Sequence, residues 1–113
     1  MALPKQRAVV FRAVEGFRDE YDKFSNGNQT VDDRMREFYQ AKEKIPPAQL
    51  PGTMKDHKLT GALLDYKECH LDSNALLLYT HADDVVTLYA VCTHDDIEGK
   101  GSKAMAKKLA KRA

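Results

Sequence analysis

Apolar residues follow a strand-like pattern first and a helix-like pattern next in the N-terminal half of the chain. Residues 7–11 form a short run rich in β-branched side chains, which predicts a first strand. Over residues 14–24 the apolar side chains recur every three or four positions, the spacing of an amphipathic helix. A second helix is expected to start with Thr30 as its N-cap and to stop before the proline pair at 46–47. One strand followed by two helices is therefore predicted.

The C-terminal half has the pattern of a β-meander. Residues 46–61 are rich in Pro, Gly, Lys and Asp, which indicates a long irregular connection. Three candidate strands follow, at residues 63–70, 75–80 and 85–92, separated by short turns. A short C-terminal helix can begin at Ser102. The expected fold class is α+β, with two N-terminal helices packed on a mainly antiparallel four-stranded sheet in the order β-α-α-β-β-β.

Length and composition limit the kind of protein. At 113 residues, the chain is expected to form a single domain over residues 1–113. No apolar run approaches the roughly 20 residues of a membrane helix, and the first residues lack the apolar stretch of a secretory signal. A cytoplasmic protein without a membrane partner is expected. Cys69 and Cys92 have no CxxC spacing and are interpreted as reduced, buried strand residues.

Charge is unevenly distributed although the net charge is only +1. The C-terminal tail, residues 99–113, carries six basic side chains and no acidic one, which leaves 12 basic against 17 acidic side chains in residues 1–98. Such a tail can contact nucleic-acid phosphates or an acidic protein surface, or it can be simply solvated. It has few apolar residues to bury, so we expect the fold to survive its removal.

Three histidines mark the candidate chemistry. His70 ends the first strand of the meander and His94 follows the third; these strands run in the same direction, so both residues belong to one rim of the sheet, roughly 10 Å apart. His57 lies in the irregular connection, whose path is not predictable. His81 is expected in the turn at the opposite end, as a solvated residue. Imidazoles gathered at one rim can transfer protons near neutral pH.

Four short motifs occur in order within residues 50–94: DHxLxG at 56–61, YxxCH at 66–70, LLxY at 76–79 and TH at 93–94. Their order and spacing resemble the YafQ-type branch of the RelE/ParE superfamily of toxin-antitoxin toxins. The resemblance implies the RelE/ParE-like fold and a type II toxin. It further implies a ribonuclease that cleaves mRNA in the A site of the 70S ribosome and is held inactive by a cognate antitoxin.

In such toxins the counterparts of His57, His70 and His94 are catalytic, and the resemblance carries this role to these three residues. The chemistry suits imidazole: the RNA 2′-hydroxyl loses a proton as it attacks the neighbouring phosphate, and the departing 5′-oxygen gains one. Cationic side chains stabilise the additional charge on the phosphorus centre. The reaction needs no metal or other cofactor.

The chain departs from the family pattern at four positions. The pattern has an acid and a tryptophan where Asn74 and Ala75 stand, an arginine at Ala90 and an aromatic residue at Glu98. Asn74 is not a general base, and Ala90 removes a cation near the phosphate. Asp72, in the same turn as Asn74, is the candidate to replace the missing acid, and we include it among the catalytic residues. Activity is expected to rest mainly on the histidines.

RNA contacts are expected from polar and basic side chains near the histidines and on the tail. Three alternatives to the enzyme remain open. In one, the histidines are purely structural residues of an unrelated α+β domain. A degenerate relative would keep the fold and bind a partner protein or nucleic acid without cleavage. A zinc site would use His57, His70, His94 and Asp72 as ligands, which are of suitable types. The expected RNA-binding residues are Lys55, Lys58, Lys67, Asn74, Lys100, Lys103, Lys107 and Lys108.

Overall fold

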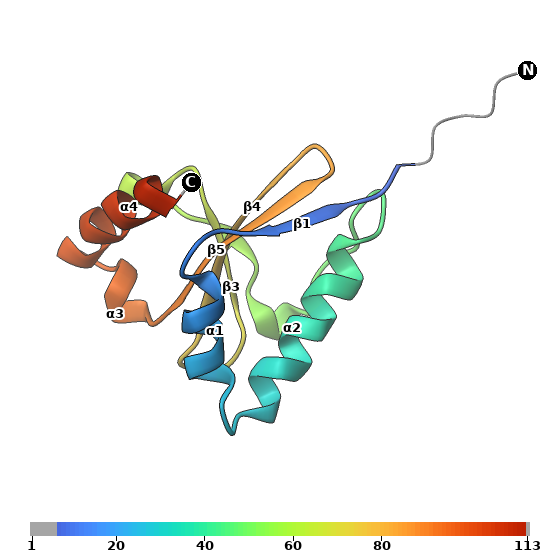
Figure 1. The fold of residues 1–113 in the computed structure, drawn as a ribbon, viewed down its shortest axis with the longest axis horizontal. Helices are drawn as coiled ribbons and strands as arrows, with labels where there is room; N and C mark the ends of the chain where they lie inside the picture. Colours follow the sequence, from blue (N-terminus) through green and yellow to red (C-terminus); the bar gives the residue numbers. More distant parts are fainter. Residues whose placement is uncertain (1–6, 113) are drawn as a thin grey trace, which may run out of the picture.

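A five-stranded sheet with helices on both faces forms the protein (Figure 1). The computed structural model describes residues 7–112. The strands are β1 (Val10–Ala13), β2 (His57–Lys58), β3 (Lys67–His70), β4 (Leu76–Ala82) and β5 (Val85–Cys92). The helices are α1 (Phe17–Ser25), α2 (Gln29–Lys42), α3 (His94–Ile97) and α4 (Lys100–Arg112), with single 3-10 turns at η1 (Gly52–Met54) and η2 (Gly61–Leu63).

The strand order is β1-β5-β4-β3-β2, with β1 parallel to β5 and every other pair antiparallel. The α+β fold, the two N-terminal helices and the meander are confirmed. The strand count is corrected from four to five, because His57 and Lys58 pair with Glu68 and Lys67 at the sheet edge. A two-residue strand inside a polar connection has no alternating apolar pattern, so it gave no signal in the sequence.

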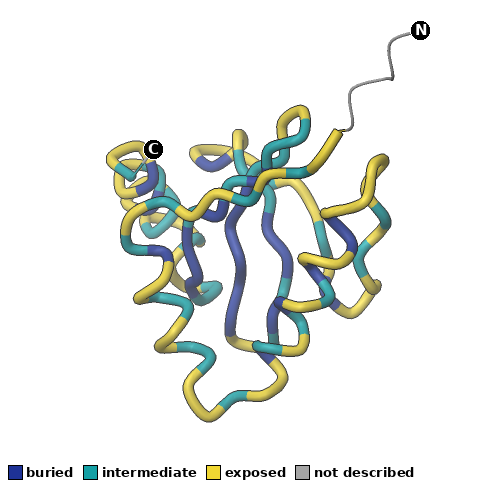
Figure 2. The backbone as a smooth tube through the Cα atoms, turned by 45° about the vertical axis from the view of Figure 1, so that its right-hand side comes forward, coloured by how far each residue is buried: buried dark blue, intermediate teal, exposed yellow. Residues whose placement is uncertain are grey.

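Two apolar clusters lie on opposite faces of the sheet. The larger one joins α1 and α2 to one face and contains Phe17, Val31 and Phe38. The second joins α4 and η2 to the other face and contains Leu63, Met105 and Leu109. Figure 2 shows that the central strands are the most deeply buried part of the backbone. The near-continuous apolar runs of β4 and β5 follow from this burial on both sides.

Strand β5 contains a bulge that changes which of its side chains face each side of the sheet. The register passes from Leu78 opposite Ala90 to Tyr79 opposite Leu88, so Tyr89 is the additional residue. The bulge shifts the alternation of side chains, and Ala90 therefore faces α4 while Leu88 faces α1 and α2. The carbonyl oxygen of Tyr89 accepts a hydrogen bond from Arg112 at 3.0 Å.

Several element boundaries differ from the sequence prediction. The first strand begins at Val10 rather than at residue 7, and β3 begins at Lys67 because residues 61–63 form η2. The N-cap of α2 is Asn28, not Thr30: the Asn28 side chain accepts a hydrogen bond from the Val31 amide at 3.3 Å. The same side chain donates to Asp72 at 2.7 Å and so joins the start of α2 to the β3–β4 turn.

The expected C-terminal helix is confirmed, but it is longer than the sequence suggested. It is α4, a helix of 13 residues that begins at Lys100 rather than at Ser102. Met105 and Leu109 are buried, at helical spacing, against the sheet. The small number of apolar residues in the segment suggested little burial, but these two fall on one face of the helix. Within residues 7–112, no helix is long and apolar enough to cross a membrane.

Candidate active site

A buried glutamate links two of the three histidines. Glu68 in β3 lies directly opposite His57 in β2, and His70 follows two residues later on the same face of the strand. One carboxylate oxygen of Glu68, Oε1, lies 3.3 Å from His57 Nε2 and 3.6 Å from His70 Nε2. The Glu68 side chain is only 4% exposed. Its second oxygen, Oε2, has no hydrogen-bond partner among the described residues.

His94 completes the group from another element. It begins α3 directly after β5, where Thr93 and Asp96 form a capping box that fixes the start of the helix. The rings of His70 and His94 have centroids 5.0 Å apart and an angle of 66° between their planes. The two histidines thus meet at one rim, closer than the two strand spacings assumed from the sequence.

His70 and His57 lie in different environments. Burial lowers the pKa of His70, and a charged His94 lowers it further, while Glu68 opposes this shift. A neutral His70 can accept a proton at neutral pH. His57 is half-exposed, and both of its nitrogens lie beside oxygen acceptors: Nδ1 is 2.7 Å from the Lys55 carbonyl oxygen and Nε2 faces Glu68.

A hollow of about 570 Å³ adjoins His70 on the side of the β3–β4 turn. Lys55, Arg34 and Asp72 line it. Asp72 uses both oxygens for local contacts, since Oδ2 accepts from Asn28 and Oδ1 from the Asn74 amide at 2.7 Å. Asp72, proposed as a catalytic residue, therefore also holds the β3–β4 turn in place through these two hydrogen bonds.

The predicted basic residues do not form one surface. Lys67 alternates with Glu68 and points to the opposite face of β3, where it approaches Asp56 at 3.5 Å. Lys108 is paired with Glu20 at 2.8 Å, whereas Lys103 and Lys107 are exposed on α4. The other predicted contacts, Lys58, Asn74 and Lys100, are exposed.

His81 is corrected from a solvated turn residue to a half-buried residue of β4. The hairpin turn is shorter than expected, because Ala82 already pairs with Val85 and Asp83 adopts a positive φ of 54°. Cys69 and Cys92 are free and buried, as expected, and burial raises the pKa of both thiols. Neither thiol contributes a nucleophile at neutral pH.

Glu68 is the residue that sequence reasoning missed. The family pattern has its acid after the second histidine, where this chain has Asn74. The signal was present two residues before His70, because positions i and i+2 of a strand share a face. The zinc interpretation gains no support, since no group of three or more His, Cys, Asp and Glu side chains within residues 7–112 is arranged to hold a metal ion.

Solved toxins share this fold. E. coli YafQ is 17% identical with a TM-score of 0.61, covering 80% of this chain and 99% of that protein. A copper-bound variant of a Helicobacter pylori toxin is 21% identical with a TM-score of 0.62, covering 79% and 98%. A YoeB/ParE toxin from Agrobacterium tumefaciens is 12% identical with a TM-score of 0.61, covering 76% and 99%. These similarities define an α+β RelE-like toxin fold.

The sequence of residues 10–99 matches the model of the YafQ family, described as the bacterial toxin of a type II toxin-antitoxin system. The chain belongs to this family of endoribonuclease toxins. E. coli YafQ has also been crystallised in complex with DinJ, its antitoxin, and that YafQ is 18% identical to this chain with a TM-score of 0.63, covering 80% and 98%. No curated protein sequence matches this chain. Helix α4 lies outside the residues matched by the family model.

Proposed function

We propose that this toxin cleaves mRNA on the 70S ribosome by attack of the RNA 2′-oxygen on the adjacent phosphate. The single observation that carries the proposal is the cluster of His57, Glu68, His70 and His94 at one rim of the sheet. Histidines in proximity, one of them neutral at neutral pH, provide a proton acceptor and a proton donor for the same phosphate.

In the proposed reaction, neutral His70 accepts the proton of the 2′-hydroxyl as the bond from O2′ to phosphorus forms. Glu68 favours the tautomer of His70 with its proton on Nε2, which leaves Nδ1 as the acceptor. Protonated His94 donates to O5′ as the bond from phosphorus to O5′ breaks. The products are a 2′,3′-cyclic phosphate and a 5′-hydroxyl end.

His57 and Lys55 are assigned to the charge that develops on the phosphate. The His57 ring lies between Glu68 and the Lys55 carbonyl, and Lys55 itself lines the hollow next to His70. Lys58 and Asn74 are proposed as RNA contacts at the same edge, with Asp72 shaping the turn that carries Asn74. On α4, Lys100, Lys103 and Lys107 are proposed to contact ribosomal RNA phosphates.

A cognate antitoxin is the proposed protein partner, as for the E. coli relative that forms a complex with DinJ.

The test of cleavage is a purified translation reaction with 70S ribosomes and a defined mRNA. Cleavage should require ribosomes and should yield 5′-hydroxyl fragments. His70→Ala and His94→Ala should each reduce it by on the order of 100-fold or more. Fragments with 5′-phosphate ends would contradict the mechanism.

A second candidate function rests on a separate observation. Ala75 and Ala90, which stand where the family pattern has a tryptophan and an arginine, are both fully buried. Neither position can contact RNA. A toxin relative that binds its antitoxin without cleaving RNA is therefore the alternative, and it predicts no mRNA fragments from the wild-type protein.

A further inference from the structure

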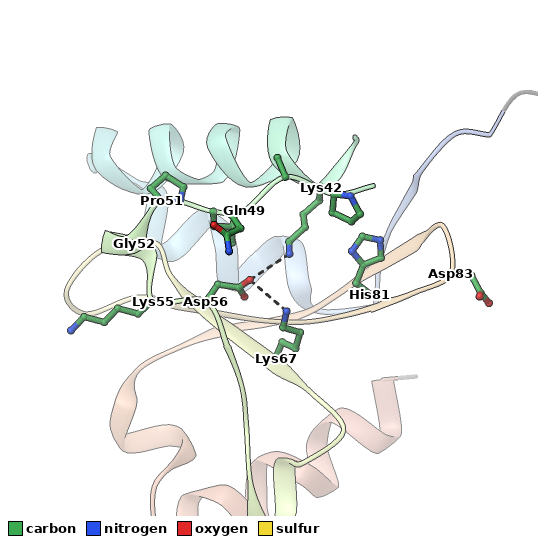
Figure 3. Close-up of a pocket in the computed structure, with 12 residues that line it drawn as sticks. Lys42, Gln49, Pro51, Gly52, Lys55, Asp56, Lys67, His81 and Asp83 are labelled. Atoms are coloured by element: carbon green, nitrogen blue, oxygen red, sulfur yellow. Dashed lines mark hydrogen bonds and ion pairs between the residues drawn. The ribbon is translucent and has the colours of Figure 1, made fainter. Parts of the chain in front are cut away.

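Two lysines share one aspartate beneath the connection between α2 and β2. Asp56 Oδ2 lies 3.5 Å from Lys42 Nζ and 3.5 Å from Lys67 Nζ, and the hydroxyl group of Tyr79 donates a hydrogen bond to Asp56 Oδ1. Figure 3 shows the lysines approaching Asp56 from either side, Lys42 from α2 and Lys67 from β3. Burial and this hydrogen bond raise the pKa of Tyr79, which therefore remains a neutral donor.

The cluster contains two lysines and one aspartate, so one positive charge is not neutralised. Lys42 has a side chain only 7% exposed, and Asp56 is 19% exposed. Two ammonium groups thus face a single carboxylate in a partly buried site, where an uncompensated charge is costly. Each ammonium carries three N–H donors, and the contact with Asp56 uses one. The ring of Tyr79, 5.2 Å from Lys42 Nζ, adds only a weak cation–π contact.

These groups line an open cavity of about 850 Å³, which is within the size range of small-molecule sites. Pro47, Leu50 and Pro51 form an apolar wall, and Gln49 contributes an amide. His81 faces the lysines from β4, whereas Lys55 and Asp83 point away from the cluster (Figure 3). One side of the cavity is therefore apolar, and the other presents cationic donors.

We propose that this cavity binds a nucleotide through its phosphate group, which Lys42 and Lys67 hold together. The two ammonium groups each lie 3.5 Å from the same oxygen, so a tetrahedral anion can accept hydrogen bonds from both. Lysine acts on phosphate as a point charge with several donors and needs no planar, bidentate geometry. The apolar wall provides a surface for the sugar and base.

The lysine pair lies on the opposite face of the sheet from Glu68, although Lys55 lines both this cavity and the hollow beside His70. Lys67 and Glu68 are consecutive residues of β3 and lie on opposite faces of the sheet, and the same holds for Asp56 and His57 at the start of β2. Phosphate binding here does not rest on the proposed cleavage reaction. The nucleotide can be free or part of an RNA strand, since both present the same phosphate.

His81 provides a spectroscopic reporter of the cavity. Burial lowers its pKa, and the nearby charges of Lys42 and Lys67 lower it further, while Asp84 acts in the opposite direction. A bound phosphate would offset the two lysines. The pKa of His81, followed by NMR through its ring protons, should therefore rise when ligand is added, while the histidines of the other face should titrate as before.

The experiment measures binding of adenosine 5′-monophosphate and of a six-nucleotide 2′-O-methyl RNA, which cannot be cleaved, by calorimetry. Lys42→Met and Lys67→Met keep the aliphatic stem and remove one charge each, and each should weaken binding about tenfold, as expected for a hydrogen bond to a charged group. Lys23→Met, which removes an exposed lysine on α1, is the matched control and should bind like wild type.

The two ligands show whether the bound phosphate belongs to a free nucleotide or to an RNA strand. Binding of the monophosphate assigns the cavity to a free nucleotide, and binding of the oligonucleotide alone assigns it to an RNA strand. The thermal unfolding midpoint of each variant shows whether it is folded. Lys67→Met should disturb the fold less than Lys42→Met, because the Lys67 side chain is 37% exposed and that of Lys42 is buried. Unchanged affinity in a folded Lys67→Met, or an unchanged titration of His81 with ligand, would overturn the proposal. His70→Ala should leave this binding intact even if it abolishes cleavage.

Discussion

Glu20 of α1 binds Arg112 of α4 through both of its carboxylate oxygens, at 2.8 Å and 2.7 Å. Lys108 reaches the same carboxylate at 2.8 Å, and the combined effect of the two cations lowers the pKa of Glu20 in spite of its burial. The C-terminal helix is thus attached to the N-terminal helix pair by charge and to the sheet by Met105 and Leu109. A segment beyond the family-matched region is part of the folded structure.

We therefore predict that Leu109→Ala destabilises the protein by about 2 to 4 kcal/mol, because it removes a fully buried side chain and leaves a cavity. Urea unfolding measures the change. Lys103→Ala, at an exposed position of the same helix, is the control and should change stability by less than about 0.5 kcal/mol. Equal stability of Leu109→Ala and wild type would show that α4 does not contribute to the fold.

Restoring the family's arginine at position 90 should fail. Ala90 is fully buried and belongs to the same apolar cluster as Met105 and Leu109. An arginine there would bury a charge without a partner and displace α4, so Ala90→Arg should lower the unfolding midpoint and should not increase cleavage. The motif departures alone suggest that replacing the lost groups would strengthen the enzyme; the packing at position 90 predicts the opposite there.

Asn74→Asp is the matched change at the other departure. Asn74 is exposed, so the substitution should be tolerated and should report only on chemistry. If the missing acid limits the reaction, cleavage in the ribosome assay should increase while the unfolding midpoint remains the same. A rise in activity with Ala90→Arg instead would contradict the packing described for α4.

Stability should fall as the pH drops through the titration range of histidine. The pKa values of both His70 and His81 are lowered from 6.5 in the folded protein. As the pH falls below about 6.5, the unfolded chain therefore binds protons before the folded protein does. The stability that these two neutral histidines contribute is fully present above that pH and is lost as the pH approaches their lower pKa values in the folded protein. Denaturant unfolding at several pH values measures it, and His81→Gln should reduce the slope. Constant stability over this range would contradict the two shifts.

The exposed lysines of α4 should contribute to ribosome binding through phosphate contacts. Replacing Lys103 and Lys107 together by Gln should weaken binding to ribosomes and reduce the slope of log affinity against log salt by about one per lysine. Lys108→Gln is the comparison, because Lys108 is paired with Glu20 and should affect stability more than binding. If all three lysines contribute equally to the salt dependence, the pairing is not maintained in solution.

The two N-terminal helices, the meander and the shared rim of His70 and His94 could be predicted from the sequence, because each follows from the spacing of apolar residues or from strand direction. Helix α3 was not predicted. The sequence was not sufficient for β2, whose two residues have no period, or for the bulge at Tyr89, which depends on pairing across strands. The role of Met105 and Leu109 required the helix to be placed on the sheet. The position of Glu68 beside His70 follows from their i, i+2 spacing in a strand, but the family pattern has its acid at position 74 instead.

The central claim is that His70 and His94 act on one phosphate and that Glu68 holds His70 in the tautomer that accepts the proton. The most direct measurement maps the 5′ ends of a defined mRNA after reaction with ribosomes and toxin, for wild type, His70→Ala, His94→Ala and Glu68→Gln. We predict ribosome-dependent 5′-hydroxyl ends for wild type, a loss on the order of 100-fold or more for each histidine variant, and a smaller loss for Glu68→Gln, which keeps the shape of the side chain. Wild-type protein that yields no fragments, or histidine variants that cut as well as wild type, would contradict the account.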